Sequence, residues 1–400
     1  MYNEVKKSVI KKIKNNTMII RSNLREFRGC TDGQYFDVSM ERVQEIGHIM
    51  NWTTGFWNGM ALHAYEWSGD KELLEWNEQF FGEYFDKVHT METMHDLGFL
   101  YSPYAVYMHN LTGEEKYKSL AVKAADELAK RFNPFGNYIR AWGRVDNCVP
   151  DYVDSELAKD GFFQNGDGLA IIDCMMNLPL LFWASESTGN PFYKRIAICH
   201  ADITIKHFIR EDYSVVHACR FNPLTGEYMH EENYCGYSNG SYWARGTTWA
   251  IYGFAIAYRY TKKEEYLDLS IKLCEKFIEN CEADFVPIWD FRLPKDAPAT
   301  ACSIKDPAWD ITKAENTKFN RDTSACAIAI CAIKEILNHK KVDSFETYVQ
   351  NAIKSLIENY YNNDVNIPGI LAEQNGCRTY TSFGDYYFVE ALLEKKKNIW

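Results

Sequence analysis

Two kinds of helix alternate along this sequence, and their alternation constrains the fold more than any other feature. Apolar, aromatic or alanine-rich segments end at short polar turns, and a charged amphipathic segment follows each turn. We predict apolar helices over 52–67, 96–109, 168–186, 241–260, 322–338 and 384–395. We predict amphipathic helices over 2–24, 71–88, 115–132, 191–209, 264–281 and 343–361. Helices that are apolar on every side are buried, whereas amphipathic helices face water on one side. Six inner helices within a ring of six outer ones form an (α/α)6 barrel, the all-α fold that we predict.

The long connections of the chain all precede inner helices. They cover 133–165, 210–240 and 282–321, whereas the turns that follow inner helices are short. Long loops gathered at one end of a fold are typical of a binding or catalytic face. The sequence contains no evident linker, so we predict that residues 1–400 form a single catalytic domain. The alternative is a helical array with irregular insertions.

The charge balance and the apolar content limit the partners that we expect. The formal net charge is −11, from 44 basic and 55 acidic residues. No Lys/Arg-rich block is interleaved with aromatic residues, so we do not expect nucleic-acid binding. No apolar stretch reaches 18 residues, so we do not expect a membrane-spanning segment. We expect a monomer or a weak dimer.

The cysteine and histidine patterns bear on location and cofactors. The sequence has 12 cysteines but no CxxC pair, and several lie within apolar helical segments. This pattern favours reduced thiols, and the N-terminus lacks the features of a signal peptide, so we expect a cytoplasmic protein. No HExxH motif, helical histidine pair or glycine-rich phosphate motif is present, so we expect neither a metal nor a cofactor.

One acid, Asp173, lies within an otherwise apolar run over 171–183. An ionised carboxylate in such a run costs several kcal/mol unless it is paired, so Asp173 requires a partner, a raised pKa or a function. Asp96 begins the preceding inner helix, whose axis we expect about 8–10 Å away. Two neighbouring buried carboxylates raise one another's pKa, which keeps one of them protonated for proton donation. Apolar surroundings favour protonated Asp173, and backbone N–H groups at a helix start favour ionised Asp96.

Other polar and aromatic residues collect at the same ends of the predicted inner helices. They are Trp52, Trp57, Asn58, His95, Trp243, Arg245, Asp322 and Asp385. Tryptophan platforms beside paired carboxylates suggest carbohydrate chemistry, and an inverting glycosidase would hold its carboxylates about 6.5–9.5 Å apart. Arg245, flanked by Trp243 and Trp249, offers a bidentate fork for a carboxylate or sulfate, or else an ion pair with a neighbouring acid. For Asp322 and Asp385 we favour helix N-caps.

Several motifs occur in an order that is similar to a known family. They are His95-Asp96-Leu97-Gly98-Phe99, Ile171-Ile172-Asp173 with Asn177-Leu178-Pro179-Leu180, Gly236-Tyr237-Ser238 with Trp243-Ala244-Arg245-Gly246, and Gly384-Asp385-Tyr386-Tyr387. From Trp52 to the C-terminal helix, the chain resembles the unsaturated glucuronyl hydrolases of glycoside hydrolase family 88. The resemblance implies release of a 4,5-unsaturated uronic acid from lyase-generated glycosaminoglycan disaccharides. Such enzymes protonate C4 of the vinyl ether, water adds at C5, and the hemiketal opens to release the second sugar.

The resemblance also implies roles for individual residues. Asp173 would donate the proton and then activate water, and Asp96 would be the partner carboxylate. The implied substrate-binding residues are Trp52, Trp57, Asn58, His95, His217, Trp243, Arg245, Trp249 and Tyr386, with Trp142 stacking on the second sugar. Cys235 stands where the family pattern leads us to expect glutamine, and the loop 144–168 is longer than expected. Both departures bear on which second sugar is accepted.

Three alternatives remain open at this stage. A related hydrolase of unsaturated rhamnogalacturonyl disaccharides from pectin would share the barrel and the chemistry. An inverting glycosidase would act on saturated substrates. A non-catalytic sugar-binding barrel would retain the aromatic platforms without using Asp173.

Overall fold

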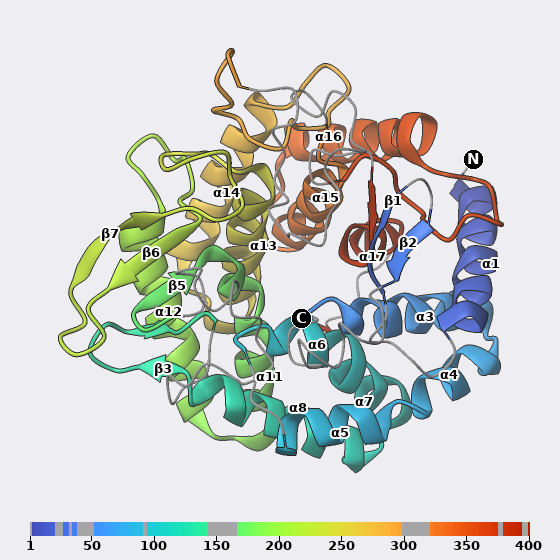
Figure 1. The fold of residues 1–400 in the computed structure, drawn as a ribbon, viewed down its shortest axis with the longest axis horizontal. Coiled ribbons are helices and arrows are strands. Elements are labelled where there is room, and N and C mark those ends of the chain that lie inside the picture. The colour runs from blue at the N-terminus through green and yellow to red at the C-terminus, as the bar shows by residue number, and fades with distance from the viewer. Residues whose placement is uncertain are drawn as a thin grey trace.

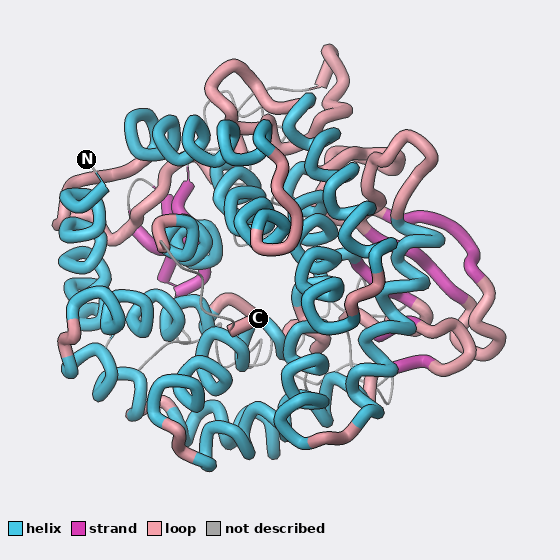
Figure 2. The backbone as a smooth tube through the Cα atoms, turned by 180° about the vertical axis from the view of Figure 1, so that it is seen from behind, coloured by secondary structure: helices cyan, strands magenta, loops and turns pink. Residues whose placement is uncertain are grey.

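A ring of outer helices surrounds a ring of inner helices in the computed structural model (Figures 1 and 2). The structure describes residues 2–20, 27–31, 34–37, 52–90, 94–142, 166–297, 321–374, 379–393 and 399–400. The inner helices are α3 (Thr54–Ser68), α6 (Leu97–Tyr101) with α7 (Tyr107–Thr112), α11 (Leu178–Thr188), α13 (Ala244–Thr261), α15 (Thr323–Leu337) and α17 (Ser382–Ala391). The outer helices are α1 (Tyr2–Ile20), α4 (Lys71–Glu78) with α5 (Phe81–Thr90), α8 (Glu115–Ala129), α12 (Pro191–Phe208), α14 (Glu264–Glu279) and α16 (Asp343–Ser355). The predicted (α/α)6 barrel is confirmed.

The inner helices pack in sequential order around the barrel. Each contacts the next along the chain, and the last of them, α17, packs against the first, α3, which closes the ring. Helix α15 illustrates why these segments lie inside, because nearly all of its side chains are apolar or small and all but two, Lys334 and Leu337, are buried. Helix α14 alternates buried apolar positions with exposed acids and lysines, as expected for the outer layer.

Three inner helices end in the same way. Gly69, Gly113 and Gly189 follow α3, α7 and α11 with φ angles of 71°, 72° and 75°. In each case the glycine N–H bonds a carbonyl of the last helical turn. A left-handed residue after the helix reverses the chain at low cost only when it lacks a Cβ atom. These glycines produce the short polar turns that lead to the outer helices.

The third inner helix differs from its predicted span of 168–186. Its first residues form strand β5 (Leu169–Ile171), followed by a 3₁₀ turn over Ile172–Met176, and α11 begins only at Leu178. Gly168 has a φ of 75°, and a Cβ atom there would lie 1.9 Å from the carbonyl oxygen of Phe221. The short apolar run that follows Gly168, Leu169–Ile171, pairs with a neighbouring strand instead of forming a helix. The predicted start of this helix was therefore wrong.

The partner strands lie within the segment 210–240 that we expected to be a loop. Strand β6 (Ala218–Phe221) pairs antiparallel with both β5 and β7 (Tyr228–Glu232), with Ile171 opposite Ala218. This sheet lies at the left of Figure 1. A second three-stranded sheet joins β1 (Phe27–Thr31), β2 (Gln34–Asp37) and β8 (Thr379–Thr381). A two-stranded sheet joins β3 (Phe132–Asn133) and β4 (Tyr138–Ile139). Residues 143–165 and 298–320, which make up most of two predicted loops, lie outside the described residues.

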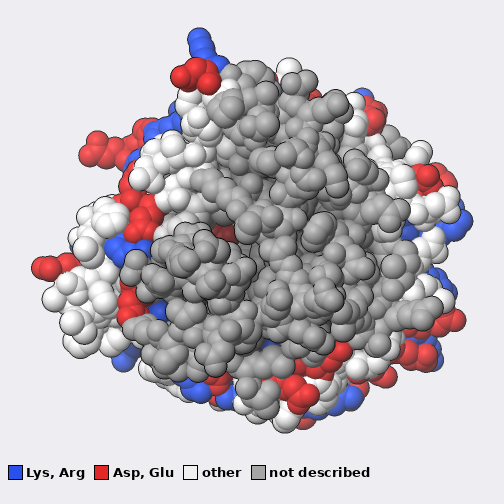
Figure 3. Space-filling model, in the orientation of Figure 1, with Lys and Arg blue, Asp and Glu red and all other residues white. Residues whose placement is uncertain are grey.

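The surface of the described part carries charges of both signs. Figure 3 shows lysine and arginine side chains interspersed with aspartate and glutamate around the edge of the barrel. None of the helices in the described ranges combines the length and the apolarity that crossing a membrane would require.

Candidate active site

Most of the residues predicted from the sequence meet where the inner helices begin. Asp96 directly precedes α6, Asp173 lies in the 3₁₀ turn before α11, and Arg245 lies in the first turn of α13. Asp322 precedes α15, and Phe383 lies in the first turn of α17. The short turns after the inner helices place these starts together at one end of the barrel, as the sequence predicts.

The two carboxylates, Asp96 and Asp173, form a coupled buried pair. Their side chains are 9% and 14% exposed. Burial, followed by the negative charge of Asp173, raises the pKa of Asp96 to about 8. Burial raises the pKa of Asp173 to about 6, opposed by the charge of Arg245 and by the indole of Trp249. Near neutral pH such a pair holds one proton between its two members.

The expectation that a helix start keeps Asp96 ionised was wrong. Asp96 occupies the N-cap position of α6, yet its side chain makes no capping hydrogen bond. Without that bond, burial dominates and favours the protonated form. His95 lies beside it, with Nε2 3.4 Å from Oδ1 of Asp96, and burial lowers the pKa of His95 to about 3. A neutral imidazole therefore gives Asp96 no counter-charge.

This pair has a consequence for stability. A folded-state pKa above the unfolded value means that the folded protein retains a proton between about pH 4 and pH 8 that the unfolded chain loses, so stability falls as pH rises. We expect Asp96→Asn to remove most of this slope. In thermal melts, the difference between the mutant Tm and the wild-type Tm should change in favour of the mutant by about 2–5 °C between pH 5 and pH 9. A difference that is constant across this range would contradict the raised pKa.

Asn177 holds the two acid-bearing segments together, a role that the sequence analysis missed. Its Oδ1 accepts the N–H of Phe99 at 3.0 Å, and its Nδ2 donates to the carbonyl oxygen of Asp173 at 3.3 Å. A Cβ atom at Gly98 would lie 2.5 Å from Cα of Asn177, so only glycine permits this approach of α6. An amide inside an otherwise apolar run was the signal that would have identified Asn177.

The strand pairing described above places His217 beside Asp173. Ile172 donates its N–H to the carbonyl oxygen of His217 at 2.9 Å, which extends the β5–β6 ladder. Nδ1 of His217 accepts the N–H groups of Tyr234 at 3.0 Å and Cys235 at 3.3 Å. The imidazole proton must then be on Nε2, which lies 3.7 Å from Oδ2 of Asp173. The backbone thus fixes the tautomer and points a donor at the acid.

Arg245 lies between two aromatic rings. Its guanidinium carbon is 4.6 Å from the ring centroid of Trp243 and 4.8 Å from that of Phe383. Phe383 in turn stacks on Trp52, with centroids 5.1 Å apart. Nη1 lies 3.7 Å from Oδ2 of Asp322, so the alternative of an ion pair with an acid also holds. Within the described ranges Nε and Nη1 have no hydrogen-bond partner, although the residue is only 6% exposed. An anion at the Nε edge of the guanidinium would accept the Nε–H in a charge-assisted hydrogen bond.

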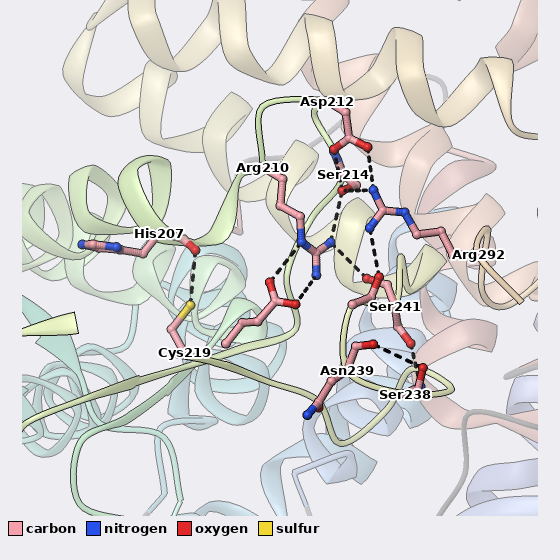
Figure 4. A network of polar contacts seen from close by, with 11 residues as sticks. His207, Arg210, Asp212, Ser214, Cys219, Ser238, Asn239, Ser241 and Arg292 are labelled. Atoms are coloured by element: carbon pink, nitrogen blue, oxygen red, sulfur yellow. Dashed lines mark hydrogen bonds and ion pairs between the residues drawn. The ribbon is translucent and has the colours of Figure 1, made fainter. Parts of the chain in front are cut away.

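Two other arginines, Arg210 and Arg292, anchor the segment that leads into α13 (Figure 4). Arg210 donates to the carbonyl oxygen of Ser241 at 3.1 Å, and Arg292 donates to that of Gly240 at 2.9 Å. Ser238 closes the turn by donating its N–H to Oγ of Ser241 at 2.7 Å. These bonds fix the backbone immediately before Trp243 and Arg245.

The remaining predicted aromatic and thiol residues fall into two groups. Trp142 is 8% exposed and packs near the site, with its ring centroid 6.4 Å from that of His217. Cys235 is partly buried, and its backbone N–H donates to Nδ1 of His217. Trp57 is buried in α3, Trp249 is fully buried in α13, and Tyr386 packs against Phe56 inside the barrel.

Two polar residues at the predicted mouth form internal bonds instead. Asn58 donates to Asn77 and accepts from the Tyr84 hydroxyl, so its amide links α3 to the outer helices. Asp385 does not cap α17, contrary to our expectation, because Thr381 provides that cap. Asp385 instead accepts the N–H groups of Ile370 and Leu371 at 3.0 and 2.8 Å. The cap predicted for Asp322 is confirmed, since its Oδ1 accepts the N–H of Ala325 at 3.2 Å.

A helical barrel whose mouth combines two buried acids with raised pKa values, tryptophan rings and a buried guanidinium has the architecture of a glycoside hydrolase. Residues 19–281 match the model of Glycosyl Hydrolase Family 88, and the chain belongs to this family. Within the described ranges, no group of three or more His, Cys, Asp or Glu side chains is arranged to hold a metal ion.

Characterised relatives have similar lengths and related sequences. The unsaturated chondroitin disaccharide hydrolase of Streptococcus pyogenes serotype M1 is 33% identical over 364 residues, which cover 87% of this chain and 82% of the relative. The crystal structure of unsaturated glucuronyl hydrolase from Bacillus sp. GL1 superposes with a TM-score of 0.80 at 28% identity, covering 98% of this chain and 96% of that one. A mutant of the Streptococcus agalactiae enzyme, complexed with dGlcA-GalNAc6S, superposes with a TM-score of 0.73 at 26% identity, covering 98% and 90%.

Proposed function

We propose that this glycoside hydrolase releases the 4,5-unsaturated uronic acid from the non-reducing end of lyase-generated glycosaminoglycan disaccharides. One arrangement carries the proposal, namely the Asp96–Asp173 pair beside the Arg245 guanidinium, whose Nε and Nη1 make no hydrogen bond within the described ranges. A proton donor to carbon and an anion receptor are the two groups that an unsaturated uronate requires. The names of the relatives, which include a chondroitin disaccharide hydrolase and glucuronyl hydrolases, support this substrate class.

Substrate binding itself prepares Asp173 to donate its proton. In the free protein the positive charge of Arg245 lowers the pKa of Asp173. When the uronate carboxylate pairs with Arg245, that charge is neutralised and a new negative charge lies nearby, so the pKa of Asp173 rises. The shared proton of the pair then moves toward Asp173, where the reaction needs it.

The reaction adds one water molecule across the vinyl ether. Asp173 transfers its proton to C4, and positive charge develops at C5 and the ring oxygen. Ionised Asp173 then takes a proton from water as the water oxygen bonds C5, which restores the acid. The resulting hemiketal opens, and the bond between C1 and the second sugar is lost as that sugar leaves. His217, whose Nε2 proton faces Oδ2 of Asp173, stabilises the carboxylate between the two proton transfers.

Loss of ultraviolet absorbance tests the proposal directly, because hydration destroys the conjugated C=C–carboxylate group. We expect the absorbance of disaccharides from lyase-digested chondroitin or hyaluronan to fall on incubation with the protein. Pectin-lyase fragments serve as the comparison, since faster loss there would indicate the rhamnogalacturonyl activity. Release of reducing sugar from saturated disaccharides without an absorbance change would instead indicate an ordinary glycosidase. Absorbance that persists with every unsaturated substrate would refute the proposal.

We also propose one catalytic domain that acts in the cytoplasm as a monomer or a weak dimer. Several cysteines, among them Cys174, Cys274 and Cys326, are buried thiols within helices or helical turns, which supports a reducing compartment. A single cooperative unfolding transition and a monomer mass by light scattering are the expected results.

A further inference from the structure

A polar network lies behind Trp142 and His217, and none of its members was predicted from the sequence. Arg220 on β6 pairs with Glu232 on β7 through two bonds, Nε to Oε1 at 2.7 Å and Nη2 to Oε2 at 2.9 Å. Nη1 of Arg220 donates to the carbonyl oxygen of Asp167 at 2.9 Å. The Tyr234 hydroxyl donates to Oε2 of Glu232. We refer to Arg220, Glu232 and Tyr234 as the hairpin network.

Tyr234 contacts two residues of the candidate site with two different parts of its structure. Its backbone N–H donates to Nδ1 of His217 at 3.0 Å, which helps to fix the imidazole proton on Nε2. Its ring meets the ring of Trp142 edge to face, with centroids 5.2 Å apart and planes at 90°. A favourable aromatic pair of this geometry orients both rings.

Trp142 depends on such a contact because it lies outside the main core. It belongs to a small apolar cluster with Ala141, Leu169, Ile171 and Ala218. The other four members are small or aliphatic, and within the described residues Met94 and Tyr234 pack against this cluster. The Tyr234 ring lies nearer to Trp142 than the rings of His95 and His217, whose centroids are 6.2 and 6.4 Å away, so it contributes most to the orientation of Trp142.

The ion pair keeps that ring in place over a wide pH range. Burial alone would raise the pKa of Glu232, but hydrogen bonds from Arg220 and Tyr234 outweigh burial and lower it. An ionised carboxylate is a stronger acceptor for a tyrosine hydroxyl than a neutral one. Arg220 is itself anchored to the backbone before β5, so the network ties the Tyr234 ring to the sheet that carries His217.

We propose that Tyr234 is a positioning residue that sets the orientation of Trp142 relative to His217 and Asp173. Tyr234 then holds the Trp142 ring, which contacts the second sugar, in a fixed position relative to the groups that act on the uronate. This inference rests on the proposed function, in which Trp142 contacts the second sugar. Tyr234 acts through Trp142, so its loss weakens recognition of the second sugar and leaves the chemical step intact.

The decisive variant is Tyr234→Phe, which keeps the ring and the backbone N–H and removes the hydroxyl bonds to Glu232 and Arg220. Tyr228→Phe is the matched control, because Tyr228 lies on the same hairpin, is 40% exposed and stacks on His207. Two substrates are compared, the unsaturated chondroitin disaccharide and the methyl glycoside of the 4,5-unsaturated uronate, which lacks the second sugar. Trp142→Ala and the double variant Tyr234→Phe/Trp142→Ala complete a mutant cycle.

We expect Tyr234→Phe to raise KM for the disaccharide about 3- to 10-fold, an effect the size of one ordinary net hydrogen bond because it reaches the substrate only through Trp142, with kcat within about twofold. KM for the methyl glycoside should stay within about twofold of the wild-type value, and Tyr228→Phe should change neither constant. In the Trp142→Ala background the substitution should have no further effect. Equal changes on both substrates, no change on either, or additive effects in the double variant would overturn the inference.

A second measurement does not depend on turnover. In protein labelled with 5-fluorotryptophan, the Trp142 resonance, assigned with Trp142→Phe, should shift or broaden in Tyr234→Phe and stay unchanged in Tyr228→Phe. An unmoved resonance would overturn the positioning role even in an active enzyme. If the wild-type protein hydrates no unsaturated uronide, the proposed function fails, and the fluorine spectrum alone decides whether Tyr234 positions Trp142.

Discussion

Replacing Asp173 by Asn should lower kcat by about 10²-fold or more while binding of the disaccharide persists. Asparagine has nearly the same shape but has no acidic proton to transfer to C4 and cannot later accept one from water. The mutant side chain also removes half of the coupled pair, so Asp96 loses the charge that helps to raise its pKa. Single-turnover loss of ultraviolet absorbance, mutant against wild type, measures the chemical step apart from product release.

The control for this substitution is Asp268→Asn on the outer helix α14. Asp268 is 57% exposed and pairs with Lys340 at 3.4 Å, a contact of small energetic value at a solvated surface. Its kcat should match that of the wild type. If Asp173→Asn retained full activity, or lost activity only together with substrate binding, Asp173 would not be the proton donor. The non-catalytic sugar-binding barrel would then become the better account.

Replacing Arg245 by Lys should lower kcat/KM for the unsaturated disaccharide about 10²- to 10³-fold, mostly through KM. Lysine keeps the charge but loses the planar fork and the stacking between Trp243 and Phe383. Truncating one member of a desolvated charge pair costs about 2–5 kcal/mol, which sets this range. Arg195→Lys, on the exposed face of α12, is the matched control and should behave as the wild type.

The charge of Arg245 has a separate signature in the pH profile. Arg245 lowers the pKa of Asp173 in the free enzyme, so Arg245→Gln should raise that pKa. Because Asp173 acts in its protonated form, the alkaline limb of the kcat/KM profile should move to higher pH in the Gln variant. The Lys variant keeps the charge, so its alkaline limb should stay near the wild-type position. An unmoved limb in Arg245→Gln would show that the two groups are not coupled, and thermal melts would establish that both variants are folded.

The barrel was predictable because its signal is repeated. Each inner segment is apolar on all sides and each outer segment is apolar on one side, and a short polar turn leads from an inner to an outer segment five times. The start of the third inner helix was not predictable in the same way. Leu169, Ala170 and Ile171 are compatible with a buried helix or a buried strand, and periodicity cannot separate these for so short a run. The pairing with β6, some 50 residues away, decides it.

The site was predictable as a set of residues but not in its electrostatics. Asp96 and Asp173 stood out because acids are costly in apolar segments. The relative order of their pKa values depends on whether the Asp96 side chain makes a capping bond, and that is a matter of local geometry. The amide of Asn177 stands out in its apolar run, but its role depends on a contact with Phe99, 78 residues away. The role of Tyr234 depends on contacts with Trp142 and His217, and no local pattern marks it.

The closure of the ring by α17 determines when this site is complete during synthesis. Asp96, Asp173 and Arg245 all leave the ribosome well before Phe383, yet the Arg245 guanidinium lies between Trp243 and Phe383. Trp52, near the start of the barrel, likewise gains its stacking partner only after Phe383 has been synthesised. Domains of this kind fold as units, and contacts between distant ends of a chain form late. The anion receptor is therefore assembled last, so that a nascent chain carries the acids for catalysis before it can hold a uronate.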